Sequence, residues 1–471
     1  MKLTLGRIED FVQGSGDFDR NLVAAGYSID SRTLRPGELF FAVAGERVDG
    51  HDFVEAALHA GAAAAVVRRD MLARYSLQAG LIAVDDTLAA LQCLAAAVRR
   101  LWARTVIGVT GSTGKTTTKD AIAHVFSSRF KVLKSAGNLN NHFGLPLQLL
   151  RLEREHEIAV IEMGMSHAGE IRALAALAQP DIGVITNVAP VHLEFFDSLA
   201  GIARAKYELI SSLPTGGTAV LNADDEYVSQ FGRDFNGKVV TYGIRRPADV
   251  RAENIEPRGL LGSGFDVMVG GHRERASIAL VGEHNVLNSL AAIAVACERG
   301  ITLQTAIESL GTLAAAEKRG EILRLGGATI INDCYNSNPK ALKSMIDALL
   351  SVPAARHVVV AGEMLELGPA AESLHDECGR FMALKGVKLL VGVRGVAEAM
   401  VRAAAAEGVE AIFVDTPEEA GERIAAELRP NDAILMKASR GVRLERALEI
   451  LKSRKDASPD AASVSAVDPG R

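Results

Sequence analysis

Residues 105–118, TVIGVTGSTGKTTT, have the types and the spacing that phosphate binding requires. An apolar, β-rich run ends in a glycine-rich turn, and a helical pattern begins at Lys115. Backbone N–H groups of such a turn converge on the positive end of the helix dipole, where an anion is stabilised. Lys115 adds a full positive charge for outer phosphates, and Thr116 offers a hydroxyl to a magnesium ion. The segment therefore predicts a strand, a phosphate-binding loop and a helix.

The glycine spacing of this loop departs from the strict form of the motif. That form, G-x-x-x-x-G-K-[ST], requires a glycine where this chain has Val109. The glycines present are Gly108, Gly111 and Gly114, which fit a tighter variant, G-x-x-G-K-T. A glycine-rich turn that binds nothing is the alternative. It is disfavoured because strand, glycines, lysine and threonine all occur in the required order.

Polar residues follow two further predicted strands of the same region. The strand 158–161 leads into Glu162, and the strand 182–186 is followed by His192. Carboxyl ends of parallel strands share one edge of a sheet, so both residues should project toward the edge that holds Lys115. A carboxylate there can hold Mg²⁺ directly or through water, because magnesium prefers hard oxygen ligands. The alternative for Glu162 is a helix cap or a solvated acid.

Other polar residues have ordinary structural explanations on spacing alone. His192 fits a satisfied structural histidine, Lys206 fits a solvated helical lysine, and Asn285 fits a helix cap. The same holds for a group of loop residues near the N-terminus, namely Ser31, Arg32, Asp49 and His51. Spacing by itself therefore assigns no chemistry to these side chains.

Three α/β units are needed to position these residues. Residues 1–85 alternate short strands, turns and helices, and 86–315 follow the pattern of a mainly parallel sheet with helices on both faces. Residues 316–455 repeat that pattern as a three-layer, Rossmann-like sandwich. A helix over 87–100, with a threonine cap, leads into the second unit. The tail, 456–471, has no apolar period and is predicted to be disordered.

Polar segments also follow three predicted strands of the third unit. They are NDCYNSNP at 332–339, GEMLELG at 362–368 and KASRG at 437–441. Because each follows a strand, the three segments should converge on one edge of that sheet. Solvated loops are the default explanation, but three such segments in one unit favour a binding surface.

Composition limits the classes of function. The chain has 471 residues, 48% hydrophobic and 23% charged, which is typical of a soluble globular protein. A net charge of −6, with Lys and Arg spread along the chain, argues against a nucleic-acid or membrane surface. The four cysteines lie far apart without zinc spacing, and the sequence shows neither a secretory leader nor an 18-residue apolar run. We therefore expect a cytoplasmic protein without membrane insertion.

With these residues in view, the chain resembles the Mur ligases of peptidoglycan synthesis over nearly its whole length, to about residue 452. The resemblance is carried by a combination of motifs: TGSTGKTTT, AGNLNNHFGLP, IEMGM, VHLE, AKYE, GEHNVLN, KRGE, DCYNSNP, GEMLELG and KASR. The N-terminal segments DSR, PGELFFA and DGHDF are similar to the UDP-sugar domain of the family. A GxGxxG near the N-terminus and a DNPR signature, which mark two other branches, are absent. Both absences favour the branch that adds D-alanyl-D-alanine.

The resemblance implies roles for residues in the second and third units. ATP would be held by Gly111, Ser112, Thr113, Gly114, Lys115, Thr116 and Thr117, with Asn285 on the base and with Arg319 and Asp333 on phosphates and ribose. Mg²⁺ would be served by Thr116, Glu162, His192 and Lys206, the last as a carbamate. The catalytic set would be Lys115, Glu162, His192 and Lys206.

The resemblance also implies substrate contacts and a reaction. Ser31, Arg32, Asp49 and His51 would lie near the uridine nucleotide, and the peptide substrates would meet Asn138, Asn141, Asn336, Ser337, Asn338, Lys437, Ser439 and Arg440. A monomer would join UDP-N-acetylmuramoyl-tripeptide to D-alanyl-D-alanine through an acyl phosphate made from ATP. The alternatives are another Mur-type ligase or a folylpolyglutamate synthetase-like enzyme. A more distant alternative is a nucleotide-driven switch or binding module.

Overall fold

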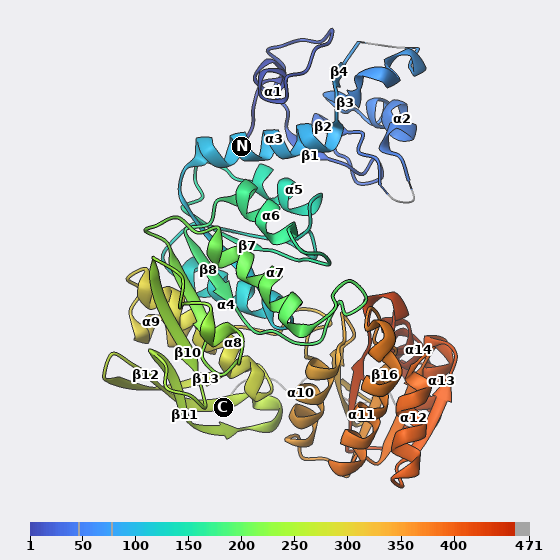
Figure 1. The fold of residues 1–471 in the computed structure, drawn as a ribbon. Coiled ribbons are helices and arrows are strands. Elements are labelled where there is room, and N and C mark those ends of the chain that lie inside the picture. The colour runs from blue at the N-terminus through green and yellow to red at the C-terminus, as the bar shows by residue number, and fades with distance from the viewer. Residues whose placement is uncertain (46–47, 77–78, 457–471) are drawn as a thin grey trace, which may run out of the picture.

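The structure is a computed structural model that describes residues 1–45, 48–76 and 79–456. These residues form three α/β units, each built on its own sheet, so the predicted fold class is confirmed (Figure 1). The N-terminal unit lies at the top of Figure 1, the central unit below it, and the C-terminal unit at the lower right. The predicted disordered tail lies outside the described residues, apart from residue 456, which ends the last helix.

The N-terminal unit is a four-stranded parallel sheet in the order β1-β2-β3-β4. Its strands are β1 (Gly26–Ser28), β2 (Glu38–Phe41), β3 (Ala64–Arg68) and β4 (Leu81–Val84), with helices α1 (Leu5–Val12) and α2 (Val54–His59). Neighbouring residues alternate between two cores. Phe41 packs toward the core shared with α1 and α3 (Thr87–Trp102), and Phe40 packs toward α2.

Helix α3 connects the first two units. Its cap is Asp86, whose carboxylate accepts the N–H groups of Leu88 and Ala89 at 2.8 and 2.9 Å. The expected threonine cap is therefore wrong by one residue. The Thr87 hydroxyl instead donates to the carbonyl of Ala42 at 2.9 Å, which ties the helix to the N-terminal sheet.

The central unit is a nine-stranded sheet in the order β13-β12-β11-β10-β9-β8-β5-β7-β6. Its parallel strands are β5 (Thr105–Thr110), β6 (Val132–Lys134), β7 (Ile158–Glu162), β8 (Ile182–Ile185), β9 (Thr218–Asn222), β10 (Lys238–Gly243) and β11 (Val250–Pro257). Two antiparallel strands, β12 (Ser263–Val269) and β13 (His272–Ile278), complete one edge. The sheet is thus mainly parallel, as predicted.

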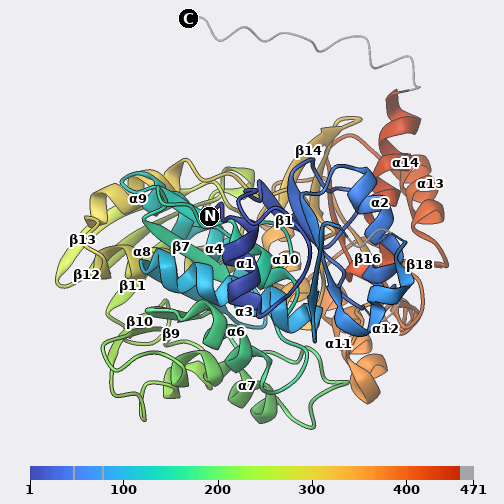
Figure 2. The ribbon, with the colours of Figure 1, turned by 90° about the horizontal axis from the view of Figure 1, so that it is seen from above.

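Helices cover both faces of the central sheet (Figure 2). One face packs against α3, α5 (Gly144–Leu150), α6 (Glu170–Ala178) and α7 (Leu199–Ser211). The other packs against α4 (Lys115–Ser127), α8 (Glu283–Glu298) and α9 (Leu303–Gly311). The side chains alternate accordingly, since Val106 of β5 points to the first core and Ile107 to the second. Burial on both faces fixes β5, and with it the loop that follows.

The C-terminal unit is a six-stranded sheet in the order β14-β15-β19-β16-β17-β18. Its strands are β14 (Glu321–Leu325), β15 (Ala328–Asp333), β16 (Arg356–Gly362), β17 (Leu389–Val393), β18 (Glu410–Val414) and β19 (Asp432–Lys437). One face is covered by α10 (Pro339–Leu350), α11 (Ala371–Leu384) and α12 (Ala397–Ala406), the other by α13 (Pro417–Glu427) and α14 (Glu445–Asp456). Only β14 runs antiparallel, so the predicted sandwich is confirmed.

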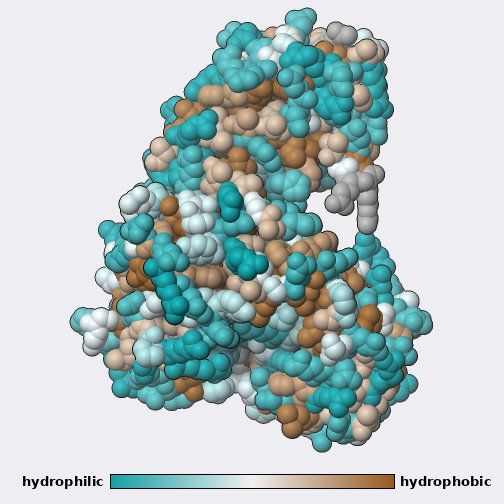
Figure 3. Space-filling model, viewed as in Figure 1, coloured by the Kyte–Doolittle hydropathy of each residue, from teal (hydrophilic) through white to brown (hydrophobic). Residues whose placement is uncertain are grey.

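Among the described residues, the surface has no extended apolar area on the face shown in Figure 3. Polar and apolar residues are interspersed there over all three units. Within residues 1–45, 48–76 and 79–456, no helix has the length and apolar character needed to cross a membrane. The boundaries expected at 85/86 and 315/316 stay predictions.

Candidate active site

A cavity of about 1060 Å³ lies between the central and the C-terminal unit. Its walls carry most of the residues that the sequence singled out in these two units, namely Ser112, Thr113, Gly114, Lys115, Thr116, Thr117, Asn138, Asn141, Glu162, His192, Lys206, Asn285, Arg319, Asp333, Asn336, Asn338, Lys437 and Arg440. Strands of two separate sheets therefore direct their carboxyl-terminal loops into one space, as the strand-end argument predicts.

The loop between β5 and α4 has a conformation that only glycine allows at two positions. Gly111 has a φ of 148°, and a Cβ there would lie 1.8 Å from Oγ1 of Thr186. Gly114 has a φ of 79°, and a Cβ there would lie 2.5 Å from Oδ1 of Asn288. The loop is also anchored to the end of β8, because the Thr113 N–H donates to Oδ1 of Asn187 at 3.1 Å. The close approach of these backbones explains the glycine spacing.

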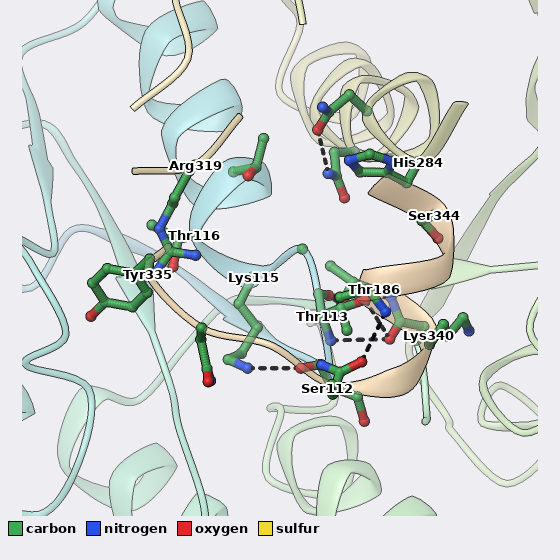
Figure 4. A pocket seen from close by; sticks show the side chains of 18 of the residues that line it. Ser112, Thr113, Lys115, Thr116, Thr186, His284, Arg319, Tyr335, Lys340 and Ser344 are labelled. Carbon is green, nitrogen blue, oxygen red and sulfur yellow. Dashed lines mark hydrogen bonds between the residues drawn. The ribbon is translucent and has the colours of Figure 1, made fainter. Parts of the chain in front are cut away.

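Lys115 lies at the first position of α4, within the curve of the loop (Figure 4). Its Nζ donates to the carbonyl of Gly111 at 2.8 Å and to that of Ser112 at 3.4 Å. Burial lowers the pKa of this ammonium; repulsion from Arg319 acts in the same direction, and attraction to Glu162 opposes it. The lysine is thus a desolvated cation beside a second cation from the C-terminal unit. An anion in this space would relieve that repulsion.

Glu162, at the end of β7, is buried and engaged through both oxygens. Oε2 accepts the Thr116 hydroxyl at 2.8 Å, and Oε1 accepts Nδ2 of Asn140 at 2.7 Å. The Lys119 Nζ lies 4.0 Å from Oε2 and donates to the carbonyl of Ser135 at 2.9 Å. A helix cap or a solvated acid does not describe this residue. The arrangement places a hydroxyl and a carboxylate, both hard oxygen donors, side by side.

The hydroxyl of Thr116 and the carboxylate of Glu162 meet the requirements of Mg²⁺ beside a nucleotide. Across the described parts of the chain, no group of three or more His, Cys, Asp and Glu side chains could hold a metal alone. Magnesium beside a nucleotide, however, uses one or two protein oxygens and completes its shell with phosphates and water. The Thr116 hydroxyl and the Glu162 carboxylate therefore fit a magnesium ion that arrives with a nucleotide.

His192 and Lys206 line the same cavity in different surroundings. The Nδ1 atom of His192 pairs with the carboxylate of Glu366, which belongs to the C-terminal unit. Lys206, in α7, is only 2% exposed, so the expectation of a solvated helical lysine is wrong. Burial, and secondarily repulsion from Lys115, lowers its pKa well below the usual range. A buried amine of this kind is held toward its neutral, nucleophilic form.

The first turn of α8 forms another wall of the cavity. Asn285 is not the helix cap, since α8 begins after Gly282; its Nδ2 donates to the carbonyl of Val281 at 2.9 Å. Oδ1 of Asn285 accepts Nδ2 of Asn288 at 3.0 Å, so the two asparagines are linked beside the phosphate-binding loop. His284 is visible in Figure 4 near α10, and burial lowers its pKa to about 4.

The C-terminal unit contributes cations whose charges are partly balanced. Nζ of Lys437 pairs with the carboxylate of Asp333 and donates to the carbonyl of Asn336 at 2.8 Å. The guanidinium of Arg319 lies 3.9 Å from the centroid of the Tyr335 ring, a cation–π contact that holds it at the cavity wall (Figure 4). The ring of Tyr335 does not neutralise Arg319, whose positive charge repels that of Lys115.

Some predicted substrate residues have structural partners here. The Asn338 side chain caps α10 through the Ala341 N–H at 2.9 Å, and the Asn141 side chain accepts the N–H of Gly144 at 2.9 Å. Ser337 and Ser439 do not line the cavity; the Ser439 hydroxyl joins two C-terminal corners. Gly111 does not line the cavity, and its carbonyl accepts the Lys115 ammonium at 2.8 Å. Substrate contacts by these residues stay predictions.

The four N-terminal residues lie apart from this cavity. His51 is buried; its Nδ1 pairs with Asp49 at 2.6 Å, and its Nε2 accepts the Arg68 N–H at 3.0 Å. Arg32 is exposed and pairs with Asp30, and Ser31 stands between them in the same turn. Both ring nitrogens of His51 are thus used inside the unit, which leaves nucleotide binding there a prediction.

Sequence reasoning missed three residues of the site. Asn140 bonds to Glu162, yet the resemblance assigns substrate contacts only to Asn138 and Asn141 of the NLNN motif. Lys119 lies one helical turn after Lys115, a spacing that places both on one side of α4. Glu366 stands within GEMLELG, and its position within that motif did not indicate a contact with His192.

Comparisons with known proteins agree over most of the chain. Three family models match: "Mur ligase family, catalytic domain" at residues 24–99, "Mur ligase middle domain" at 109–296, and "Mur ligase, glutamate ligase domain" at 318–440. The chain is 36% identical to a UDP-N-acetylmuramoyl-tripeptide--D-alanyl-D-alanine ligase from Bacillus subtilis, over 96% of this chain and 98% of the relative. A relative of the same name from Escherichia coli is 34% identical, over 88% and 90%.

Solved structures give the same result in three dimensions. A crystal structure of MurF from Acinetobacter baumannii has a TM-score of 0.87 at 29% identity, covering 96% of this chain and 99% of that one. MurF ligase from Thermotoga maritima, in complex with ADP, has a TM-score of 0.80 at 29% identity, covering 92% and 98%. With three family models in the family's domain order and relatives that match nearly end to end, the chain belongs to the Mur ligase family.

Proposed function

We propose that the protein is an ATP-dependent amide ligase that joins D-alanyl-D-alanine to UDP-N-acetylmuramoyl-tripeptide. The observation that carries the proposal is the single cavity in which the loop of Lys115 faces Arg319 of the C-terminal unit. A ligand rich in negative charge would be attracted to the space between these two cations, and a nucleoside triphosphate has that charge. The relatives that match nearly end to end carry this activity in their names.

The proposed reaction has two steps. An oxygen of the tripeptide carboxylate attacks the γ-phosphorus of ATP, which gives an acyl phosphate and releases ADP. The amine of D-alanyl-D-alanine then attacks the acyl carbon, loses a proton, and expels phosphate to form the amide. A carboxylate that approaches a triphosphate is repelled, and Lys115 and Arg319, which line the cavity from two different units, would reduce that repulsion.

Thr116 and Glu162 would hold Mg²⁺, and we assign His192 and Lys206 to the same function. Bound there, the ion would neutralise phosphate charge as a Lewis acid. The contacts from Asn140 and Lys119 keep the Glu162 carboxylate in place. Lys206, buried and held toward the neutral amine, suits reaction with carbon dioxide to give a carbamate and a proton.

We assign the remaining contacts by position in the fold. Asn336, Asn338, Lys437 and Arg440 would face the dipeptide and the nucleotide, with Asn138 and Asn141 on the opposite wall. Ser31, Arg32, Asp49 and His51 would meet the uridine end, so the substrate would extend from the N-terminal unit to the cavity. The three units would enclose the acyl phosphate and exclude water from it. A cytoplasmic monomer is the form we propose.

The test is phosphate release from ATP in the presence of UDP-N-acetylmuramoyl-tripeptide, with and without D-alanyl-D-alanine. Release and amide formation that require the dipeptide support the proposal. If another amino acid serves as the acceptor instead, a different Mur-type or folylpolyglutamate synthetase-like activity is correct. Hydrolysis that proceeds equally without any amine would favour a nucleotide-driven switch.

A further inference from the structure

A contact between two loops joins the central unit to the C-terminal unit at the cavity. One loop, 188–196, follows β8 and carries His192; the other, 363–368, follows β16 and carries Glu366. The two loops touch through three points: the pair between Nδ1 of His192 and the Glu366 carboxylate, a bond from the Glu194 N–H to the Glu366 carbonyl at 3.4 Å, and the packing of Gly368. A Cβ at Gly368 would lie 3.2 Å from Cα of Glu194.

We propose that Glu366 is a positioning residue that holds His192 in its working orientation only while the C-terminal unit is docked on the central unit. The proposal rests on the proposed function in one respect, namely that His192 serves a divalent cation in this cavity. It goes beyond that function because it makes the metal site depend on a carboxylate from another unit.

The backbone conformations of His192 and Glu366 indicate that the surrounding structure holds this contact in place. His192 has a φ of 57° and Glu366 a φ of 64°, a left-handed conformation that is uncommon for residues other than glycine. Such conformations persist where the surrounding structure holds them. Here the two residues face each other across the contact, and the hydrogen bond between their side chains links them.

The side of the contact that carries Glu366 is fixed to its own unit. The Leu365 N–H donates to the hydroxyl of Ser439 at 2.9 Å, and the Met364 N–H donates to Nε2 of the buried His375 at 2.9 Å. The loop of His192 is bonded to its own unit at its start, where the Val188 N–H donates to Asp225 at 3.0 Å and the Ala189 N–H to the Ser112 hydroxyl at 2.9 Å. Nearer His192 it has an internal turn, in which the Phe195 N–H donates to the carbonyl of His192 at 2.9 Å. Glu366 is therefore the anchored partner, and His192 is the one that is located by the contact.

The chemistry of the pair fits a role in metal binding. A carboxylate on Nδ1 fixes the proton there and leaves Nε2 as the nitrogen available to a cation or to its water. Histidines that bind metals commonly have such a carboxylate partner, which orients the ring. Both residues line the cavity that also contains Glu162 and Lys115. In this chain the partner lies 174 residues away, in a different unit.

The experiment measures the affinity of Mn²⁺, used as the probe in place of Mg²⁺, in the presence of ADP. It compares the wild-type protein with Glu366→Gln, which keeps the size of the side chain and removes its charge. We expect the dissociation constant for Mn²⁺ to rise about 10-fold in this variant, the usual effect of losing such an orienting partner. Glu194→Gln is the matched control, since Glu194 is exposed, lies on the same loop and contacts Glu366 through its backbone only.

A second measurement needs no metal. Hydrogen exchange of the amides of 188–196, in the metal-free protein, should be faster in Glu366→Gln and unchanged in Glu194→Gln. A double-mutant cycle separates positioning from a general effect: in a His192→Ala background, Glu366→Gln should change Mn²⁺ affinity no further.

Two results would overturn the inference. One is equal Mn²⁺ affinity in the wild-type protein and in Glu366→Gln; the other is a 10-fold loss that persists in the His192→Ala background. Failure of the proposed function is recognised separately. Suppose that Mn²⁺ affinity differs between the wild-type protein and Glu366→Gln, but the wild-type protein makes no amide with D-alanyl-D-alanine. That result would support the coupling and refute the ligase assignment.

Discussion

Replacing Lys115 by methionine tests the phosphate site directly. Methionine has a similar length and volume, so the change removes the charge and the two hydrogen bonds to the carbonyls of Gly111 and Ser112. Removal of one preorganised positive group from a site of phosphoryl transfer costs about 3 kcal/mol in the barrier, or about 100-fold in kcat. We therefore expect Lys115→Met to lose about 100-fold in amide formation.

The same change should have little effect on folding. Two hydrogen bonds are lost, each with a net contribution of about 1 kcal/mol. Against this loss, the variant no longer buries an ammonium whose pKa is lowered by that burial. Since the two effects oppose each other, the free energy of unfolding should change by about 1 kcal/mol or less.

Phosphate release and amide formation measure the activity, and urea unfolding measures the stability. Lys238→Met is the control, because Lys238 is a lysine of the same unit that is 61% exposed and pairs with Glu298 at the surface. Such a pair contributes about 1 kcal/mol or less. Activity within about 3-fold of wild type in Lys115→Met would refute the assignment. So would a loss that is explained entirely by unfolding.

Three other predictions concern the metal site, the loop and the C-terminal core. Glu162→Gln keeps a hydrogen-bonding side chain beside Thr116 but removes its charge, so kcat should fall about 100-fold; an unchanged kcat would exclude Glu162 as a ligand. Gly111→Ala places a methyl group against Thr186 and should lower the free energy of unfolding by about 1–3 kcal/mol; Gly216→Ala, with open space around it, is the control, and equal urea midpoints would contradict the steric argument. His375 is held neutral, because its Nε2 accepts the Met364 N–H and burial lowers its pKa. The unfolded chain therefore takes up more protons below about pH 6.5, and the free energy of unfolding should fall as the pH drops from 7.5 to 5.5; His375→Gln should reduce this slope, and an unaltered slope would count against it.

The parts of the site that the sequence predicts are those with local requirements. The loop before Lys115 needs glycine where backbones approach closely, and this requirement leaves a pattern within ten residues. Glu162 follows a predicted apolar strand, and the edge rule for parallel sheets predicts that it lies near the loop; in the structure that strand pairs with β5. The alternation of strand and helix patterns along the chain likewise predicts layered α/β units. None of these steps needs knowledge of contacts between distant segments.

Tertiary contacts decide the rest, and they leave weaker signals. Lys206 has the spacing of a solvated helical lysine, yet the fold buries it because α7 turns that side of the helix inward. Asn285 resembles a cap, but α8 starts two residues earlier, at Glu283, which leaves Asn285 at the cavity wall. Glu366 and His192 are far apart in sequence, and only the docking of two units brings them together. A single sequence gives burial patterns and strand ends, but it does not give the orientation of one unit on another.

Charge in the cavity links this orientation to the nucleotide. Lys115 and Arg319 belong to different units, and repulsion from Arg319 adds to the burial that lowers the pKa of Lys115. Lys206 is subject to the same repulsion from Lys115. A polyphosphate between them would convert repulsion into attraction, so binding of the nucleotide and docking of the C-terminal unit should stabilise each other. Because such coupling is reciprocal, substitutions of Glu366 that weaken docking should also weaken nucleotide binding. Glu366 is itself an acid, so this loss could not come from a missing attraction between its side chain and the phosphates.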